Sequence, residues 1–208
     1  GVGTFEQITT GSLVTDNGYS ETASWGDYDN DGKLDLYVTN SAGNKRNFLY
    51  HNDGNGMFTK TGTGALVTDA FVSRSVNWTD IDNDGDLDLF VSNEEDQNEN
   101  LYKNNGGGNF AKITTDPLVS DGGKTMSSSW GDYDNDGDLD LAITGSVRAV
   151  PNGPEDLQFH VFRNNGRGQF GGWNFVESAT SPFFTRCRLG CVSWGDVDND
   201  GDLDLYVT

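Results

Sequence analysis

The sequence contains few basic residues, few prolines and no long apolar run. Lysine and arginine number 13 against 33 acidic residues, and no basic patch is visible, which disfavours a nucleic-acid partner. No stretch of about 18 apolar residues occurs, so no membrane span is predicted. The first residues show no basic region followed by an apolar stretch, so we expect no signal peptide within these 208 residues. A mature or excised secreted chain would look the same.

Cysteine is also scarce, since only Cys187 and Cys191 occur. In a straight strand their Cα atoms would lie about 13 Å apart, too far for a disulfide, so a bridge requires a turn between them. We expect this turn and the disulfide, with two buried free thiols as the alternative. A disulfide would favour secretion.

The net charge of −20 has a local source, because 19 of the 33 acidic residues lie in four short segments. The remaining 14 acidic residues face 13 basic ones, so the rest of the chain is nearly neutral. Carboxylates held a few ångströms apart repel one another unless a cation lies between them. The clustering therefore indicates cation sites and not a general acidic surface.

The four acidic segments are copies of one another. They read SWGDYDNDGKLDLYVT from Ser24, NWTDIDNDGDLDLFVS from Asn77, SWGDYDNDGDLDLAIT from Ser129 and SWGDVDNDGDLDLYVT from Ser193. Their first aspartates are spaced by 53, 52 and 64 residues. A second pattern, of the type NFLYHNDGNGMF, and a third, of the type FEQITTGSLVTD, recur between them. Three patterns in a fixed order indicate a repeat protein.

Each repeat predicts four short strands. The first carries a tryptophan, and the second alternates between two faces, with Leu36 and Val38 opposite Tyr37 and Thr39. The third and fourth are joined by a Gly/Asn hairpin. Four strands in a repeat of about 50 residues are typical of β-propeller blades. We expect an all-β fold with about four such repeats of antiparallel strands, forming a single propeller region over residues 1–208. A β-sandwich would not explain the repetition.

The order of the predicted strands indicates an open arrangement. The chain begins with a fourth-type strand, GTFEQIT, and ends with a second-type strand, LDLYVT, with three complete sets between them. We therefore expect that these residues do not close a ring alone. Either they are part of a larger propeller, or a neighbouring subunit supplies the missing strand, and self-assembly through open blade edges follows from the second possibility.

Each segment contains a nine-residue Asp loop, with aspartate at positions 1, 3, 5 and 9 and glycine at position 6. Gly32 permits the sharp turn at position 6, and position 7 is expected to offer its backbone carbonyl. An all-oxygen set suits calcium better than magnesium, and the absence of cysteine and histidine from the loops disfavours zinc. We predict about four calcium ions, held by Asp27, Asp29, Asp31, Lys33, Asp35, Asp80, Asp82, Asp84, Asp86, Asp88, Asp132, Asp134, Asp136, Asp138, Asp140, Asp196, Asp198, Asp200, Asp202 and Asp204.

Other calcium loops fit poorly. An EF-hand needs a bidentate glutamate at position 12, where this chain has Val38, Val91, Ile143 or Val207. The predicted flanks are strands, so helical dockerin repeats are also excluded, and the period is wrong for a glycine-rich nonapeptide β-roll.

The quadruple Asp-x-Asp-x-Asp-Gly-x-x-Asp pattern resembles the FG-GAP/VCBS repeat family, the calcium-bearing blades of integrin α-subunit propellers and of many secreted bacterial proteins. The resemblance covers essentially the whole chain. It implies that each Asp loop joins the first two strands of a blade and holds one calcium ion. It also implies a closed form of about seven blades, and roles in adhesion, carbohydrate binding or scaffolding. Some propellers of this kind are polysaccharide lyases.

We expect the calcium ions to stabilise the blades and not to contact a ligand, because the loops are near-identical copies. The four tryptophans two residues before each loop are expected to pack between blades, whereas Trp173 is the better candidate for stacking on a sugar. His51 and His160 are expected to have ordinary surface or packing roles. The longer connections Gly145–Gln158 and Phe170–Asn174 are candidate recognition elements.

The leading hypothesis is an extracellular or cell-surface calcium-binding module for adhesion, recognition or structural assembly, without catalytic residues. Its partner would be a protein or carbohydrate of unknown identity. The alternatives are a carbohydrate-active propeller, lectin-like or a polysaccharide lyase, and a subunit of an extracellular fibre.

Overall fold

The computed structural model describes residues 3–120, 123–146, 159–167, 173–180 and 190–208. Within them, 14 strands form three four-stranded sheets and one two-stranded sheet. The first sheet contains β1 (Ser20–Gly26), β2 (Asp35–Asn40), β3 (Phe48–Gly54) and β4 (Met57–Lys60). The second contains β5 (Ser73–Thr79), β6 (Asp88–Asn93), β7 (Asn100–Asn104) and β8 (Phe110–Ile113). The third contains β9 (Lys124–Gly131), β10 (Asp140–Ser146), β11 (Phe159–Arg167) and β12 (Trp173–Thr180), and the fourth contains β13 (Val192–Gly195) and β14 (Asp204–Val207).

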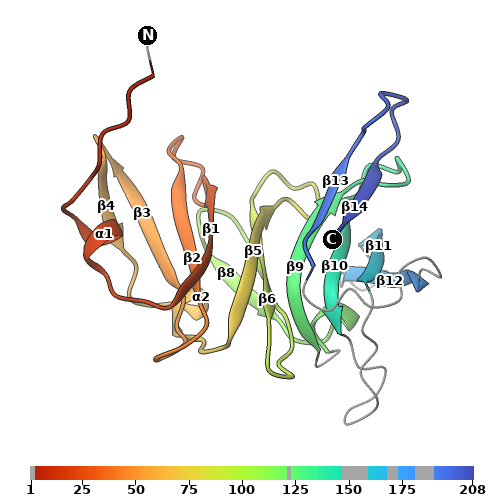
Figure 1. The fold of residues 1–208 in the computed structure, drawn as a ribbon, viewed down its shortest axis with the longest axis horizontal. Helices are drawn as coiled ribbons and strands as arrows, with labels where there is room; N and C mark the ends of the chain where they lie inside the picture. The colour runs from red at the N-terminus through yellow and green to blue at the C-terminus, as the bar shows by residue number, and fades with distance from the viewer. Residues whose placement is uncertain (1–2, 121–122, 147–158, 168–172, 181–189) are drawn as a thin grey trace.

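Strands that are adjacent in sequence pair antiparallel in every sheet. The predicted all-β fold of four-stranded, propeller-like blades is therefore confirmed. Figure 1 shows the sheets side by side in chain order, with β1 against β5, β5 against β9, and β9 against β13. In the described part of the chain, no helix is both long and apolar enough to cross a membrane.

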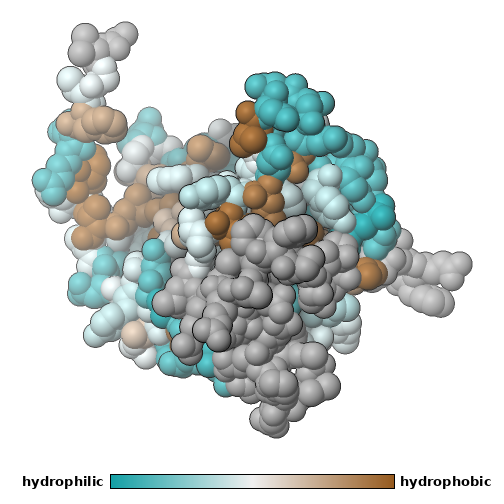
Figure 2. All heavy atoms as spheres, turned by 45° about the vertical axis from the view of Figure 1, so that its right-hand side comes forward, coloured by the Kyte–Doolittle hydropathy of each residue, from teal (hydrophilic) through white to brown (hydrophobic). Residues whose placement is uncertain are grey.

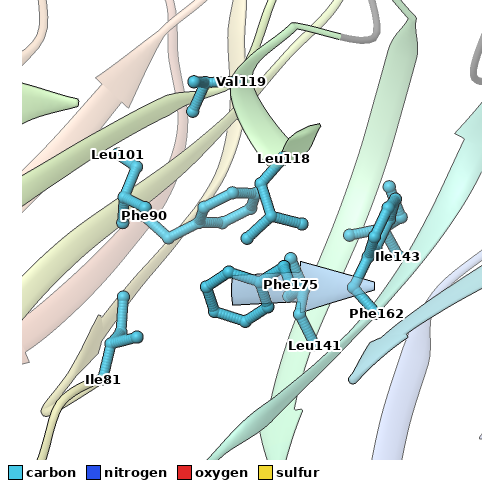
Figure 3. Close-up of a cluster of buried hydrophobic side chains, with 9 residues drawn as sticks. All are labelled: Ile81, Phe90, Leu101, Leu118, Val119, Leu141, Ile143, Phe162 and Phe175. Atoms are coloured by element: carbon cyan, nitrogen blue, oxygen red, sulfur yellow. The ribbon is translucent and has the colours of Figure 1, made fainter. Parts of the chain in front are cut away.

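The hydrophobic cores lie between consecutive sheets. Between the second and third sheets, Phe90, Leu141 and Phe175 pack together with six other buried residues, each at most 5% exposed (Figure 3). A second core, which includes Tyr37, joins the first sheet to the second, and a smaller one around Val192 joins the third to the fourth. Each sheet is thus held in place by its neighbours.

Strand β6 shows how one strand serves two cores. Leu89 and Val91 belong to the core shared with the first sheet, whereas Phe90 belongs to the core shared with the third. Because successive side chains of a strand point to opposite faces, this is the predicted two-residue alternation. Both faces are buried, since all six residues of β6 are inaccessible to solvent.

The repeated tryptophans pack across the boundaries between sheets. Trp78 of β5 stacks on Tyr28 of the preceding sheet with ring centroids 6.0 Å apart, and its Nε1 donates to the carbonyl of Ser24 at 3.3 Å. Trp194 repeats this arrangement on Tyr133, and Trp130 packs against the core in Figure 3. The predicted packing role is confirmed for these three.

Trp25 differs from the other three tryptophans because 52% of its surface is exposed. In the described part of the chain no sheet precedes the first one, so Trp25 has no preceding blade on which to stack. Its ring instead contacts Phe58 of its own sheet, at 5.9 Å between centroids.

Two details of the predicted fold are wrong. The segment GTFEQIT, expected to be a strand, forms none over residues 3–9, and Phe5 and Ile8 are exposed. In the described residues no third-type strand lies before it to accept its hydrogen bonds. The third repeat pattern also contains a helical turn in each of its first three copies, which the sequence did not predict. These turns are α1 (Ser12–Thr15), α2 (Ala65–Thr68) and the 3-10 helix η1 (Pro117–Val119).

Three expectations fall outside the described residues. Cys187 is not described, so the disulfide stays a prediction, and Cys191 is exposed. Most of the two longer connections and the side chain of Trp173 are not described either.

Candidate metal centre

The four Asp loops connect the first two strands of each sheet and lie along one edge of the molecule, at the top in Figure 1. Figure 2 shows hydrophilic side chains gathered at the upper right of that view, at the height at which Figure 1 draws the β13–β14 connection. All four loops share one backbone path. The asparagine at position 4 has φ between 56° and 61°, and the glycine at position 6 has φ between 85° and 96°. Glycine adopts such angles without steric cost, which confirms the predicted role of Gly32.

The aspartate at position 1 closes each loop. In the first loop, Asp27 accepts hydrogen bonds from the backbone N–H groups of Asp31 and Gly32, at 3.0 and 2.9 Å. Asp80, Asp132 and Asp196 accept the equivalent pairs in the other loops. One carboxylate therefore fixes positions 5 and 6 of its own loop.

The aspartate at position 9 begins the second strand of each sheet, and in the first three sheets it is fully buried. Asp88 accepts from the backbone N–H of Ile81 in its loop at 3.1 Å and from that of Asn104 in β7 at 2.8 Å. Burial raises the pKa of Asp88 to about 7 and that of Asp140 to about 6, and it also raises the pKa of Asp35. Burial therefore disfavours the charged form of each carboxylate, and a cation nearby would favour it.

The structure brings three of the predicted ligands together in each loop. Ligand atoms of positions 1, 3 and 9 lie within 4.8 Å of one another in the first, second and fourth loops, as do those of positions 1, 3 and 5 in the third. These groups are Asp27, Asp29 and Asp35; Asp80, Asp82 and Asp88; Asp132, Asp134 and Asp136; and Asp196, Asp198 and Asp204.

These residues fit a hard divalent cation. Their side chains offer only carboxylate oxygens, which suit calcium. Oδ1 of Asp134 is buried and has no hydrogen-bond partner among the described residues, although burial of an unpaired polar atom is costly. A calcium ion would supply the missing partner, and the residues at positions 1, 3, 5 and 9 would hold it.

The side chains at position 7 have another role. The side-chain amide of Asn30 donates to Asp86 of the next loop at 2.7 Å, Asn83 donates to Asp138 at 3.1 Å, and Asn135 donates to Asp202 at 2.8 Å. These bonds link consecutive Asp loops into a row. In the first loop position 7 is Lys33, which pairs with Asp31. The expected use of the position-7 carbonyl stays a prediction.

Sequence reasoning missed a basic side chain beside each of the first three loops. His51 of β3 places Nε2 3.1 Å from Oδ2 of Asp29 and 3.6 Å from that of Asp31. Lys103 of β7 pairs with Asp82 and with Asp84, the latter at 2.9 Å. Arg163 of β11 pairs with Asp134 at 2.6 Å and with Asp136 at 2.9 Å. All three contact positions 3 and 5.

The signal for these contacts was present in the second repeat pattern. His51, Lys103 and Arg163 each precede an asparagine that begins the hairpin of their repeat. Sequence reasoning gave His51 only a surface or packing role, whereas its ring lies beside the first loop. His160, in contrast, is 1% exposed and stacks on Phe162, as a packing role requires.

Comparison with known proteins agrees with the repeat structure. A family model described as FG-GAP-like repeat matches residues 39–91, 80–143 and 149–207, which together make up most of the chain. No curated protein matches the sequence. With its repeated Asp loops and antiparallel sheets, the chain belongs to the FG-GAP-like repeat family.

Proposed function

We propose that this chain is a calcium-binding, propeller-type module that acts outside the cell in adhesion, recognition or assembly and has no catalytic role. About four calcium ions bind, one in each Asp loop. FG-GAP-like repeats suggest a propeller-type module and are typically non-catalytic, which supports this part of the proposal.

The observation that carries the proposal is the fourfold repetition of one carboxylate arrangement. Each loop gathers ligand oxygens of three aspartates within 4.8 Å, on a backbone path common to all four. Without a cation these carboxylates repel one another. The basic side chains beside the first three loops balance only part of this negative charge, and an ion in each loop would offset the rest.

The contacts of the loops support a structural role for the ion. The position-9 aspartate bonds its own loop to the third strand of the sheet, as Asp88 does between Ile81 and Asn104. An ion beside this carboxylate would keep it ionised in its buried position, so that it accepts both hydrogen bonds as a charged group. Because consecutive loops are hydrogen-bonded to one another, the ions stabilise the row of blades.

The extracellular setting is proposed from the resemblance to secreted and cell-surface repeat proteins, and the affinity typical of their calcium sites would suit it. Calcium sites of extracellular modules have dissociation constants of about 10⁻⁴ to 10⁻³ M, which match the calcium level outside cells. Cytosolic calcium would leave them largely empty. The ligand of the module, a protein or a carbohydrate, would bind to a surface other than the loops.

Thermal unfolding with and without calcium tests the proposal. Binding to the folded state alone stabilises it by RT ln(1 + [L]/Kd), which at 1 mM calcium is about 0.4–1.4 kcal/mol per site. We expect the melting temperature to fall when EDTA removes calcium and to return when calcium is restored. An unchanged melting temperature would contradict calcium binding. Degradation of an acidic polysaccharide by the purified chain would contradict the non-catalytic role.

A further inference from the structure

The basic side chains beside the first three Asp loops lie where a bound cation would act. Lys103 is 20% exposed, and it pairs with Asp82, whose side chain is only 2% exposed. Pairs that are this well shielded are screened less by solvent and salt than surface pairs. The ammonium group therefore partly neutralises positions 3 and 5, which are also expected calcium ligands.

The arrangement is repeated with three different residue types. His51, Lys103 and Arg163 differ in size and shape, yet each contacts positions 3 and 5 of its loop. The three occupy the same place in their strands, directly before Asn52, Asn104 and Asn164. The feature common to them is a basic group next to the carboxylates.

The strand register explains why this position faces the loop. The backbone N–H groups of Asn52, Asn104 and Asn164 donate to the position-9 aspartates of their sheets, at 2.7, 2.8 and 2.8 Å. The bond anchors the third strand to the end of the loop. The preceding residue is then within reach of positions 3 and 5.

We propose that Lys103 and Arg163 are internal counter-ions that stabilise the metal-free loops and compete with calcium for the same carboxylates, whereas His51 carries a charge only when protonated and so is not one of them. The inference rests on the proposed calcium binding and adds to it the residues that set the affinity of each site. Two positive charges beside the same carboxylates repel each other, so calcium binding weakens the internal pair and the internal pair weakens calcium binding. The affinity of a site then depends on a strand outside the loop as well as on its nine residues.

Lys103 is the clearest case to test, because the same sheet offers a matched control. Lys112 of β8 pairs with Asp69 at 2.6 Å, which lies outside the Asp loops. Lys103→Met and Lys112→Met each remove one ammonium group from the second sheet, with two ion pairs lost in the first variant and one in the second. Only the first change alters the charge beside a predicted calcium site.

The experiment is a calcium titration of the full chain, monitored by NMR. Melting temperatures are measured in EDTA and in saturating calcium. Each loop has its own reporter, the backbone amide of its position-6 glycine, which donates to the position-1 aspartate: Gly32, Gly85, Gly137 and Gly201. We expect Lys103→Met to tighten calcium binding at Gly85 about thirtyfold, the effect of one unit charge on a doubly charged ion at about 4 Å in a water-like dielectric. The other three glycines should titrate as in the wild type.

The melting data separate competition from an ordinary structural role. Lys103→Met should lower the melting temperature more in EDTA than in saturating calcium, because only the metal-free loop loses its counter-ion. Lys112→Met should lower it equally in both and leave all four titrations unchanged. Arg163→Met, read at Gly137, repeats the test in the third sheet and keeps it decisive if Lys103→Met does not fold.

Two results would overturn the inference and are distinguishable. If the wild type responds to calcium but neither Lys103→Met nor Arg163→Met binds calcium more tightly, Lys103 and Arg163 are structural and the proposed function stands. If no glycine of the wild type responds to calcium, calcium binding fails and the inference fails with it.

Discussion

The side-chain amide of Asn83 in the second Asp loop donates a hydrogen bond to the carboxylate of Asp138 in the third, at 3.1 Å. The same amide also reaches the carbonyl of Gly137 at 3.0 Å. The contact lies outside the hydrophobic core, yet it connects two sheets. It therefore adds a polar tie between neighbouring blades.

Replacing Asn83 by glycine tests this tie. Glycine keeps the positive φ of 56° without strain, so the change removes the hydrogen bonds and adds only the backbone freedom of glycine in the unfolded chain. We expect a loss of about 0.5–1.5 kcal/mol in the free energy of unfolding, measured by urea denaturation. Asn199→Gly is the matched control, since Asn199 has the same backbone angle but its side chain donates to no group in the described residues. An equal loss in both variants would mean that the bond contributes nothing.

Loss of charge at position 5 of a loop should lower its calcium affinity, whereas loss of charge at position 7 should not. Asp84→Asn removes the charge of a predicted ligand, and we expect calcium affinity in the second loop to fall about tenfold. Asp86→Asn should leave that affinity nearly unchanged, because position 7 is expected to use its carbonyl, and the new amide oxygen still accepts from Asn30. Calcium titration read at Gly85 compares them. Equal losses of calcium affinity in the two variants would indicate that the side chain of Asp86 is itself a ligand.

Two tryptophans at equivalent positions should differ in their contribution to stability. Trp78 packs on the preceding sheet, and Trp78→Ala should cost about 3–5 kcal/mol in the free energy of unfolding, as for other large core residues. Trp25 is 52% exposed, and Trp25→Ala should cost less than about 1 kcal/mol. Chemical denaturation in saturating calcium measures both. Similar losses would show that packing between sheets is not the main role of this position.

Asp116 should make stability depend on pH. It is 4% exposed, accepts from the backbone N–H of Leu118 at 3.0 Å, and has its pKa raised by burial. A carboxyl group whose pKa is higher in the folded state binds more protons there than in the unfolded chain. The free energy of unfolding therefore falls as the pH rises from the ordinary pKa of 3.8 through the raised pKa of the folded state. We expect Asp116→Asn to reduce this fall while keeping the cap on η1. Melting in EDTA from pH 4 to 7 measures it, and identical slopes in wild type and variant would refute it.

The sequence predicted the strands and the Asp loops because these are local. The two-residue alternation and the turn glycines act within a few residues, so Leu89, Phe90 and Gly32 reveal their roles by spacing alone. The grouping of Asp27, Asp29 and Asp35 is set by one loop of nine residues.

The missed contacts depend on parts of the chain that are far apart in sequence. Lys103 lies 19 residues from Asp84, and the register between β6 and β7 decides whether they meet. The bond from Asn83 to Asp138 spans 55 residues and requires two sheets to stack. The helical turn at Ala65–Thr68 is too short to show a helical period, so hydrophobic spacing gave no sign of it.

The double membership of β6 makes the strand intolerant of insertions. Leu89 and Phe90 are neighbours in sequence but fill cores on opposite sides of their sheet. One extra residue within β6 would send each later side chain to the opposite core, placing the ring of Phe90 where Leu89 or Val91 now fits. A single inserted residue would therefore disrupt the packing of both interfaces. Length changes in such a chain are therefore tolerated in loops or as whole repeats, and the unequal spacing of its four Asp loops follows that rule.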